Sequence, residues 1–147
     1  MFLWLVVLTT TAGSALAVAV DNTWNNNSGN GLWSTSGNWS LSHPCLISEK
    51  AKLNKILGPL INEGTAATAN WIACGDGGNG AFSMTGGTLT VGTVQGDTWT
   101  ILGYGASNAG TFTMDGGTVN TVDRMFVGFM GTGTLNMNGG ALNIGGM

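Results

Sequence analysis

The side chains of this sequence that could carry out acid–base or nucleophilic chemistry are few and widely spaced. His43, the only histidine, stands two residues before Cys45, so a thiol nucleophile with a nearby base is conceivable. Such a pair works only when the base is within hydrogen-bonding distance of the thiol, and we favour a loop histidine. The carboxylates are scattered over unrelated stretches: Glu49, Glu63, Asp76, Asp97, Asp115 and Asp123. No spacing among them selects the acid pair that glycoside hydrolysis needs, so we predict that the protein is not an enzyme.

A glycine-rich run is the one stretch with the composition of a calcium-binding turn. Asp76 lies in Gly75-Asp76-Gly77-Gly78-Asn79-Gly80. Calcium turns need oxygen ligands that recur from repeat to repeat, whereas Tyr104 and Phe129 occupy the corresponding later positions. We therefore predict an ordinary turn here, and we predict no metal and no small-molecule cofactor.

Three tryptophans in a stretch rich in Asn, Ser and Gly are the best candidates for a binding site. Exposed aromatic rings can stack on sugars, so Trp24, Trp33 and Trp39 could bind a cell-surface or extracellular polysaccharide. The alternative is that the three rings close one end of the fold as a hydrophobic cap, because the terminal units of repeat folds have atypical sequences.

The composition excludes several classes of protein. The chain has 147 residues, of which 26 are glycine, and 7% are charged, against roughly 25% in an ordinary soluble domain. A net charge of −3 gives no basic surface for nucleic acid, and it is too small for a disordered chain with 43% hydrophobic residues. Cys45 and Cys74 could form a disulfide in an oxidising compartment or stay as free buried thiols.

The elements that must position these residues are indicated by a repeat. One phrase occurs at residues 80–89, 110–119 and 133–142, with starts 30 and then 23 residues apart. Apolar residues alternate with Ser, Thr or Asn within each copy, which predicts strands with one apolar face. The Gly-Gly pair inside each copy could form a hairpin or the corner of a solenoid, and we favour the corner. Aligned copies should form inward ladders of Phe82/Phe112/Leu135 and Met84/Met114/Met137.

These patterns predict an all-β fold, specifically a right-handed parallel β-helix (β-solenoid) with a tryptophan-rich cap at its N-terminal end. We assign residues 21–63 to the cap and residues 64–147 to the repeats. Within the cap, the three lysines of residues 49–55 alternate with apolar residues, which suits an exposed first strand protected by charge. A short helix in residues 46–57 is the alternative. An open solenoid end would favour self-association.

The N-terminal residues have the features of a secretory signal peptide. Residues 1–20 carry no charged side chain, and Met1 to Leu8 is almost continuously apolar. Ala15-Leu16-Ala17 is a cleavage site of the small-x-small type, so we assign residues 1–19 to the signal, cut after Ala17 or Ala19. The alternatives are a buried helix and a membrane anchor, although the apolar run is short for a span of about 20 residues. The protein is therefore expected to be secreted.

The stretch from Trp24 through Gly37-Asn38-Trp39 to Pro44, with the Gly-Thr-Phe-x-Met-x-Gly-Gly-Thr phrase, resembles secreted bacterial β-strand-repeat proteins. These are the autotransporter-associated β-strand-repeat and PEP-CTERM-type surface proteins. The resemblance covers most of residues 22–146 and implies a parallel β-solenoid at the bacterial cell surface. It favours the cap role for the three tryptophans. Because the sequence stops inside a repeat at Met147, with no sorting tail, we expect a fragment of a longer protein.

Three functions are compatible with the sequence. The first is a non-catalytic structural or adhesive protein of the cell surface, indicated by a neutral Thr/Asn/Gly repeat without a catalytic group. The second is a carbohydrate-binding or carbohydrate-active β-helix, indicated by the tryptophan cluster. The third is the passenger portion of an autotransporter.

Overall fold

The computed structural model describes residues 19–93 and 98–145, so the predicted signal peptide lies almost wholly outside the described residues. The described chain is all-β, with one short 3-10 helix, η1 (Ser36–Asn38). Its first strands are β1 (Val20–Thr23), β2 (Glu49–Leu53), β3 (Leu60–Ile61), β4 (Ala66–Ala69) and β5 (Trp71–Cys74). The next are β6 (Gly80–Met84), β7 (Thr88–Val91), β8 (Trp99–Leu102) and β9 (Ala109–Met114). The last are β10 (Thr118–Thr121), β11 (Arg124–Val127), β12 (Thr132–Met137) and β13 (Ala141–Ile144).

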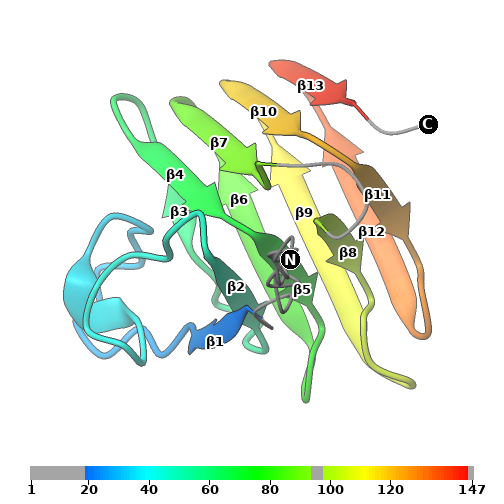
Figure 1. The fold of residues 1–147 in the computed structure, drawn as a ribbon, viewed down its shortest axis with the longest axis horizontal. Helices are drawn as coiled ribbons and strands as arrows, with labels where there is room; N and C mark the ends of the chain where they lie inside the picture. Colours follow the sequence, from blue (N-terminus) through cyan, green and yellow to red (C-terminus); the bar gives the residue numbers. More distant parts are fainter. Residues whose placement is uncertain (1–18, 94–97, 146–147) are drawn as a thin grey trace, which may run out of the picture.

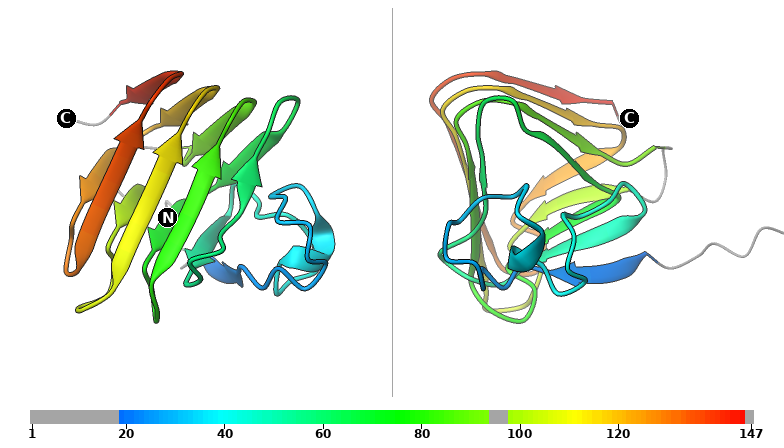
Figure 2. Two further views of the ribbon diagram at one scale, coloured as in Figure 1. Left: turned by 180° about the vertical axis from the view of Figure 1, so that it is seen from behind. Right: turned by 90° about the vertical axis from the view of Figure 1, so that its left-hand side faces the viewer.

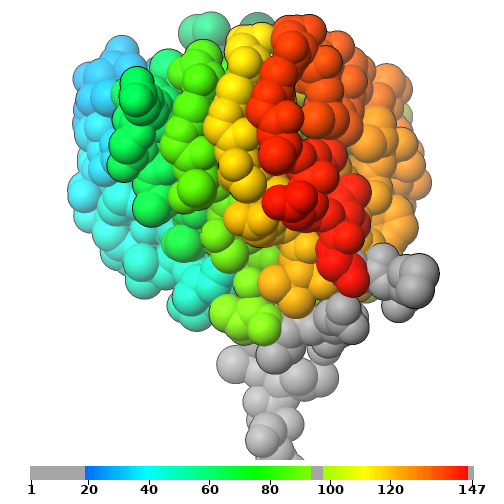
Figure 3. Space-filling view, turned by 90° about the horizontal axis from the view of Figure 1, so that it is seen from above, coloured from blue at the N-terminus to red at the C-terminus, as the bar shows by residue number. Residues whose placement is uncertain are grey.

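The strands form three parallel sheets that the chain visits in rotation. Sheet I has the order β1-β2-β5-β8-β11, sheet II has β3-β6-β9-β12, and sheet III has β4-β7-β10-β13. From β2 onward the chain passes from sheet I to sheet II to sheet III and returns to sheet I beside the preceding strand (Figure 1). Seen along the stacking direction, the sheets surround a common interior (Figure 2). Successive circuits lie side by side from the N-terminal to the C-terminal end (Figure 3).

The register of sheet II confirms the ladders predicted from the repeat. Phe112 pairs with Phe82 on one side and with Leu135 on the other. Met114 pairs in the same way with Met84 and Met137. Every pairing between named strands is parallel, so the Gly-Gly pairs make corners between sheets rather than hairpins.

The inward positions of the three sheets form one hydrophobic core. In β6, β9 and β10 of sheets II and III, buried residues alternate strictly with partly exposed ones. Inside sheet II the rings of Phe82 and Phe112 stack with centroids 4.1 Å apart and planes 8° apart. Period-two alternation therefore places the apolar side chains inside and threonine, serine and asparagine outside.

Each corner between sheet II and sheet III contains a glycine with a left-handed backbone. The φ angles of Gly87, Gly117 and Gly140 are 70°, 85° and 86°, a region that side chains with a Cβ rarely enter. The second glycine of the repeated phrase is therefore required by the turn itself.

The segment between β1 and β2 covers the first circuit at one end of the core. Trp24, Trp33 and Trp39 interlock edge to face, with ring centroids of Trp39 5.3 Å from Trp24 and 4.7 Å from Trp33. Their indole N–H groups are used locally: Trp24 Nε1 donates to the Leu57 carbonyl at 2.9 Å and Trp39 Nε1 to the Trp33 carbonyl at 2.8 Å.

The predicted exposed first strand takes a different position. Residues Glu49–Leu53 form β2, as a strand and not a helix, but β2 lies inside sheet I between β1 and β5. The outer strand at this end is β1, whose Asp21 lies beside Lys50 in register. The lysines of β2 therefore protect no sheet edge and instead meet carboxylates on both sides.

Candidate functional site

The three tryptophans considered as candidates for sugar stacking are buried. Trp24, Trp33 and Trp39 are 0%, 1% and 2% exposed, so none presents a ring face to solvent on which a sugar could stack. Of the two roles considered for these residues, their burial favours the hydrophobic cap, because their rings pack against one another and against the first circuit.

The structure does not bring His43 and Cys45 together as a base and a nucleophile. His43 Nε2 lies 3.5 Å from Glu49 Oε1, while Cys45 Sγ donates to the carbonyls of Leu46 and Glu49, both at 3.7 Å. Burial, reinforced by the charge of Glu49, raises the pKa of the Cys45 thiol far above its usual value. The second thiol, Cys74, is also buried and free. Both sulfurs act as neutral core atoms rather than reactive thiolates.

Asp76 is engaged by lysines rather than by other oxygen ligands. Its Oδ2 lies 3.2 Å from Lys50 Nζ and 3.7 Å from Lys52 Nζ. Over residues 19–93 and 98–145, no three His, Cys, Asp or Glu side chains gather as a metal site would require. Asp76 thus acts as the partner of two cations.

The outer side of sheet I carries an aromatic cluster, which we call the aromatic face: Trp71, Trp99, Ile101, Tyr104, Phe126 and Phe129. The pairing of neighbouring strands shows that Trp71, Ile101 and Phe126 point outward, because paired residues of a sheet point to the same side. Trp71 is the partner of Lys50 on β2, and Phe126 is the partner of Ile101. Ile101 is fully buried, yet it belongs to no part of the interior core. A second, smaller hydrophobic layer therefore lies on the outside of this sheet.

The rings of the aromatic face contact one another continuously. Trp71 and Trp99 stack at 4.9 Å, and Phe126 packs edge to face against Trp99 at 5.7 Å. Phe129 lies 5.4 Å from Phe126 and 6.3 Å from Tyr104. All of the rings keep some solvent-accessible surface, and Phe129 is 46% exposed. The cluster is thus open along its outer rim.

Charged side chains frame the aromatic face. Lys50 Nζ lies 2.9 Å from Asp21 Oδ1, 3.2 Å from Asp76 Oδ2 and 5.7 Å from the centre of the Tyr104 ring. Burial lowers the pKa of Lys50, but hydrogen bonds and charges from the two aspartates outweigh it and leave the pKa above 10.5. The lysine therefore stays a cation, held between two carboxylates beside an aromatic ring.

At the other side of the face, a buried carboxylate joins a tryptophan and an arginine. Asp123, which is 3% exposed, accepts a hydrogen bond from Trp99 Nε1 at 3.2 Å and lies 3.6 Å from Arg124 Nε. Arg124 itself is half-exposed. Asp123 therefore anchors one ring of the aromatic face and places Arg124 beside it.

The aromatic face was not predicted from the sequence, although the sequence contains a pattern that indicates it. The phrase Trp71-Ile72-Ala73-Cys74 is apolar throughout, and it returns at residues 99–102 with Thr100 as the one polar residue. A strand that is apolar at consecutive positions is one that is covered on both sides. The two copies therefore indicated a covered outer surface on this sheet alone.

Comparisons with protein-family models, with curated proteins and with solved structures find no match for this chain. Within the described part of the chain, no helix has both the length and the hydrophobicity to span a bilayer.

Proposed function

We propose that this chain is a non-catalytic, adhesive protein of the bacterial cell surface, folded as a right-handed parallel β-helix with a tryptophan-rich cap. The rotation of the chain through three parallel sheets supports the helical coil. The right hand follows from the near-universal handedness of connections between parallel strands. Its resemblance to β-strand-repeat surface proteins supports the location.

The observation that carries the adhesive role is the concentration of chemistry on the aromatic face. Only 11 residues of the chain are charged. Six of them border this one face: Asp21, Lys50, Lys52, Asp76, Asp123 and Arg124. Aromatic side chains with partly exposed rims, combined with arginine and lysine, are typical of surfaces that bind a partner. Most outward strand positions of sheets II and III carry Thr, Ser or Asn and offer no comparable anchor.

An extracellular polysaccharide is the partner that we propose for this face. Aromatic rims give apolar contact to pyranose rings, while carboxylates and ammonium groups accept and donate hydrogen bonds to hydroxyls. The charges of Lys50 and Lys52 balance those of Asp21 and Asp76, which suits an uncharged polymer. The aromatic face and its border therefore supply both the apolar contact and the hydrogen-bonding groups.

Binding to a panel of soluble and insoluble polysaccharides tests this proposal. Trp99→Thr and Phe126→Thr give the aromatic face the threonine found at outward positions elsewhere, and each should weaken binding about tenfold. Thr90→Ala, at an outward position of sheet III, is the matched control and should leave binding unchanged. Absence of binding to the whole panel, or equal binding by all variants, would remove the proposal. Release of reducing sugar ends would instead identify an enzyme.

Export is tested separately. Expression in a bacterial host followed by N-terminal sequencing of the secreted product should find cleavage after Ala17 or Ala19. A secreted product that still begins at Met1 would contradict the signal peptide.

A further inference from the structure

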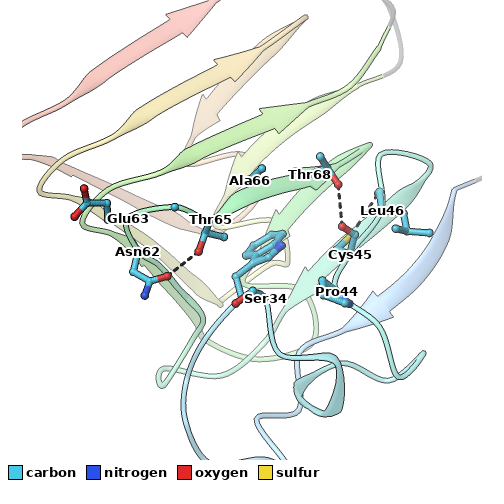
Figure 4. Close-up of a pocket in the computed structure, with 11 residues that line it drawn as sticks. Ser34, Pro44, Cys45, Leu46, Asn62, Glu63, Thr65, Ala66 and Thr68 are labelled. Atoms are coloured by element: carbon cyan, nitrogen blue, oxygen red, sulfur yellow. Dashed lines mark hydrogen bonds between the residues drawn. The ribbon is translucent and has the colours of Figure 1, made fainter.

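The stack of strands is covered at its N-terminal end by the segment between β1 and β2. In sheet II, Leu60 of β3 donates its N–H to the Gly31 carbonyl at 2.8 Å and accepts from Trp33 N at 3.0 Å. In sheet III, Thr68 of β4 donates to the Cys45 carbonyl at 3.0 Å, beside a pocket of about 540 Å³ (Figure 4). Another strand therefore cannot add to these two sheets at this end.

The opposite end of the stack is open. Strands β11, β12 and β13 are the last strands of sheets I, II and III in the described chain, and each has a strand neighbour on one side only. The N–H and C=O groups along their outer edges can therefore pair with another chain.

The inward columns of the three sheets end at the open end with exposed apolar side chains. Val127, Met137 and Ile144 are the last members of these columns, and they are 50%, 46% and 50% exposed. The register neighbours of the first two in the preceding circuit, Leu102 and Met114, are fully buried. The core therefore ends in an apolar cross-section that solvent reaches, and exposed apolar surface of this kind marks a binding surface.

The open end lacks the residues that usually keep sheet edges apart. Edge strands of monomeric proteins are commonly protected by charged side chains or by proline. Residues 125–145 contain neither, and Arg124, the first residue of β11, is the last charged residue of the sequence. At the covered end, by contrast, the outer strand of sheet I carries Asp21. The open end is therefore free to meet another apolar strand edge without repulsion.

A second copy of the chain fits the open end because the end is complementary to itself. The three sheets surround a common interior, so a twofold axis perpendicular to sheet II sets β12 antiparallel to β12 and exchanges the positions of sheets I and III (Figure 2). Strand β11 then meets β13 of the second copy. The strand lengths agree, since β11 and β13 have four residues each and β12 has six. One rotation thus pairs all three open edges.

From these observations we infer that two copies of this chain join through their open ends into a closed dimer, with β12 antiparallel to β12 and β11 antiparallel to β13. Inward residues face inward residues across the new strand pairs. The register that pairs all three inward residues of β12 sets Leu135 opposite Leu135 and Met137 opposite Gly133 of the second copy. Arg124 meets β13 of the second copy, which carries no charge. Because the other end is covered, the interface is used once and assembly stops at the dimer.

Spin labels along one outward column of sheet II test this arrangement. Ser83, Thr113 and Asn136 are register neighbours on β6, β9 and β12, and each is replaced in turn by a cysteine that carries a nitroxide. Cys45 and Cys74 are buried thiols with raised pKa values, so they remain unlabelled. Electron paramagnetic resonance then measures the distance between the labels of the two copies. This distance should be shortest for Asn136 and should grow by about 10 Å at each step back, because neighbouring strands lie about 4.8 Å apart and both labels recede.

Sedimentation velocity and a matched pair of variants complete the test. A concentration series should show a monomer–dimer equilibrium without larger species. Val127→Lys would bury an unpaired charge in the interface and should weaken the dimer at least about tenfold. Val20→Lys makes the same substitution on β1 at the covered end, where the valine is 60% exposed, and should leave the dimer unchanged. Circular dichroism verifies that both variants are folded.

Four results would overturn the inference. Equal label distances at all three positions would indicate that copies stack head to tail. Species larger than a dimer would show that the covered end does not stop assembly. Monomers at every concentration would show that the open end binds no second copy. Equal weakening of the dimer by the two folded lysine variants would place the contact elsewhere on the molecule.

Discussion

Gly110 lies so close to the carbonyl of Cys74 that a Cβ on this glycine would stand 2.5 Å from the carbonyl oxygen. Cys74 is the last residue of β5 in sheet I, and Gly110 is the second residue of β9 in sheet II. Gly80 and Gly133 are the register neighbours of Gly110, and they meet the carbonyls of Leu53 and Leu102 in the same way. A column of three glycines therefore allows consecutive circuits to approach at this corner.

Replacing Gly110 with alanine should destabilise the fold by about 3 kcal/mol, the upper end of the usual cost of overpacking, because backbone atoms surround the new methyl group. Thermal unfolding followed by circular dichroism measures the loss. Gly64→Ala is the control, since its Cβ would meet open space and only the left-handed backbone, with φ of 77°, costs about 1 kcal/mol. Equal melting temperatures for the two variants would show that the corner can relax.

A charge on the inward ladder of sheet II should prevent folding. Met114 is fully buried between Met84 and Met137, so Met114→Asp loses about 2–5 kcal/mol of apolar burial and also leaves a carboxylate without a partner. The soluble yield and the melting transition report the effect. Thr113→Asp places the same charge on the outward side of the same strand and should fold. Cooperative melting of Met114→Asp near the unmodified temperature would contradict the inward assignment.

Stability should fall under alkaline conditions because of the buried thiols. Burial raises the pKa of Cys74 from 9.0 to about 12, so the folded chain keeps this proton after the unfolded chain has lost it. This contribution is complete below pH 9.0 and is lost as pH rises toward about 12, by up to about 1.4 kcal/mol per pH unit. The free energy of unfolding, measured with urea, should fall less steeply between these pH values in Cys74→Ala than in the unmodified chain. Parallel declines would mean that the thiol is not buried.

The end formed by β11, β12 and β13 should favour self-association. Met137 and Ile144 continue inward ladders, yet they are 46% and 50% exposed, whereas Met114 in the preceding circuit is fully buried. Sedimentation velocity over a concentration series should show association. Met137→Lys and Ile144→Lys should each weaken it at least about tenfold, since burying an unpaired charge exceeds 1.4 kcal/mol. Asn136→Lys, on the outward side of β12, serves as control. Monomers at every concentration would refute the proposal.

The strands and register of sheets II and III were predictable because their sequences alternate. In residues 80–91 and 110–121, the apolar side chains face the core and the polar ones face solvent. Aligning the two phrases therefore specifies which residues become neighbours. Sheet I is harder to predict, because Trp71-Ile72-Ala73-Cys74 gives no alternation from which to assign a face. The outward direction of Trp71 emerges only from its pairing with Lys50.

The cap and the pocket depend on contacts that no local pattern records. Trp33 lies in a polar stretch that is compatible with exposure, and its burial results from Trp39 and from the first circuit of the core. Strand β1 could not be recognised either. Val20–Thr23 lacks an alternating pattern, and it forms a strand because β2 offers it an edge. Contacts with residues distant in the sequence therefore determine both the burial of Trp33 and the formation of β1.

The unequal spacing of the repeats has a consequence for how such a molecule can diversify. Seven residues, 92–98, join β7 to β8, whereas two residues, 122–123, join β10 to β11. Likewise six residues, 103–108, follow β8, and four residues, 128–131, follow β11. All of the extra length therefore falls at the two corners that border sheet I, while the corners from β6 to β7, from β9 to β10 and from β12 to β13 each have three residues. Insertions at this border can remodel the rim around the rings while leaving the interior scaffold untouched.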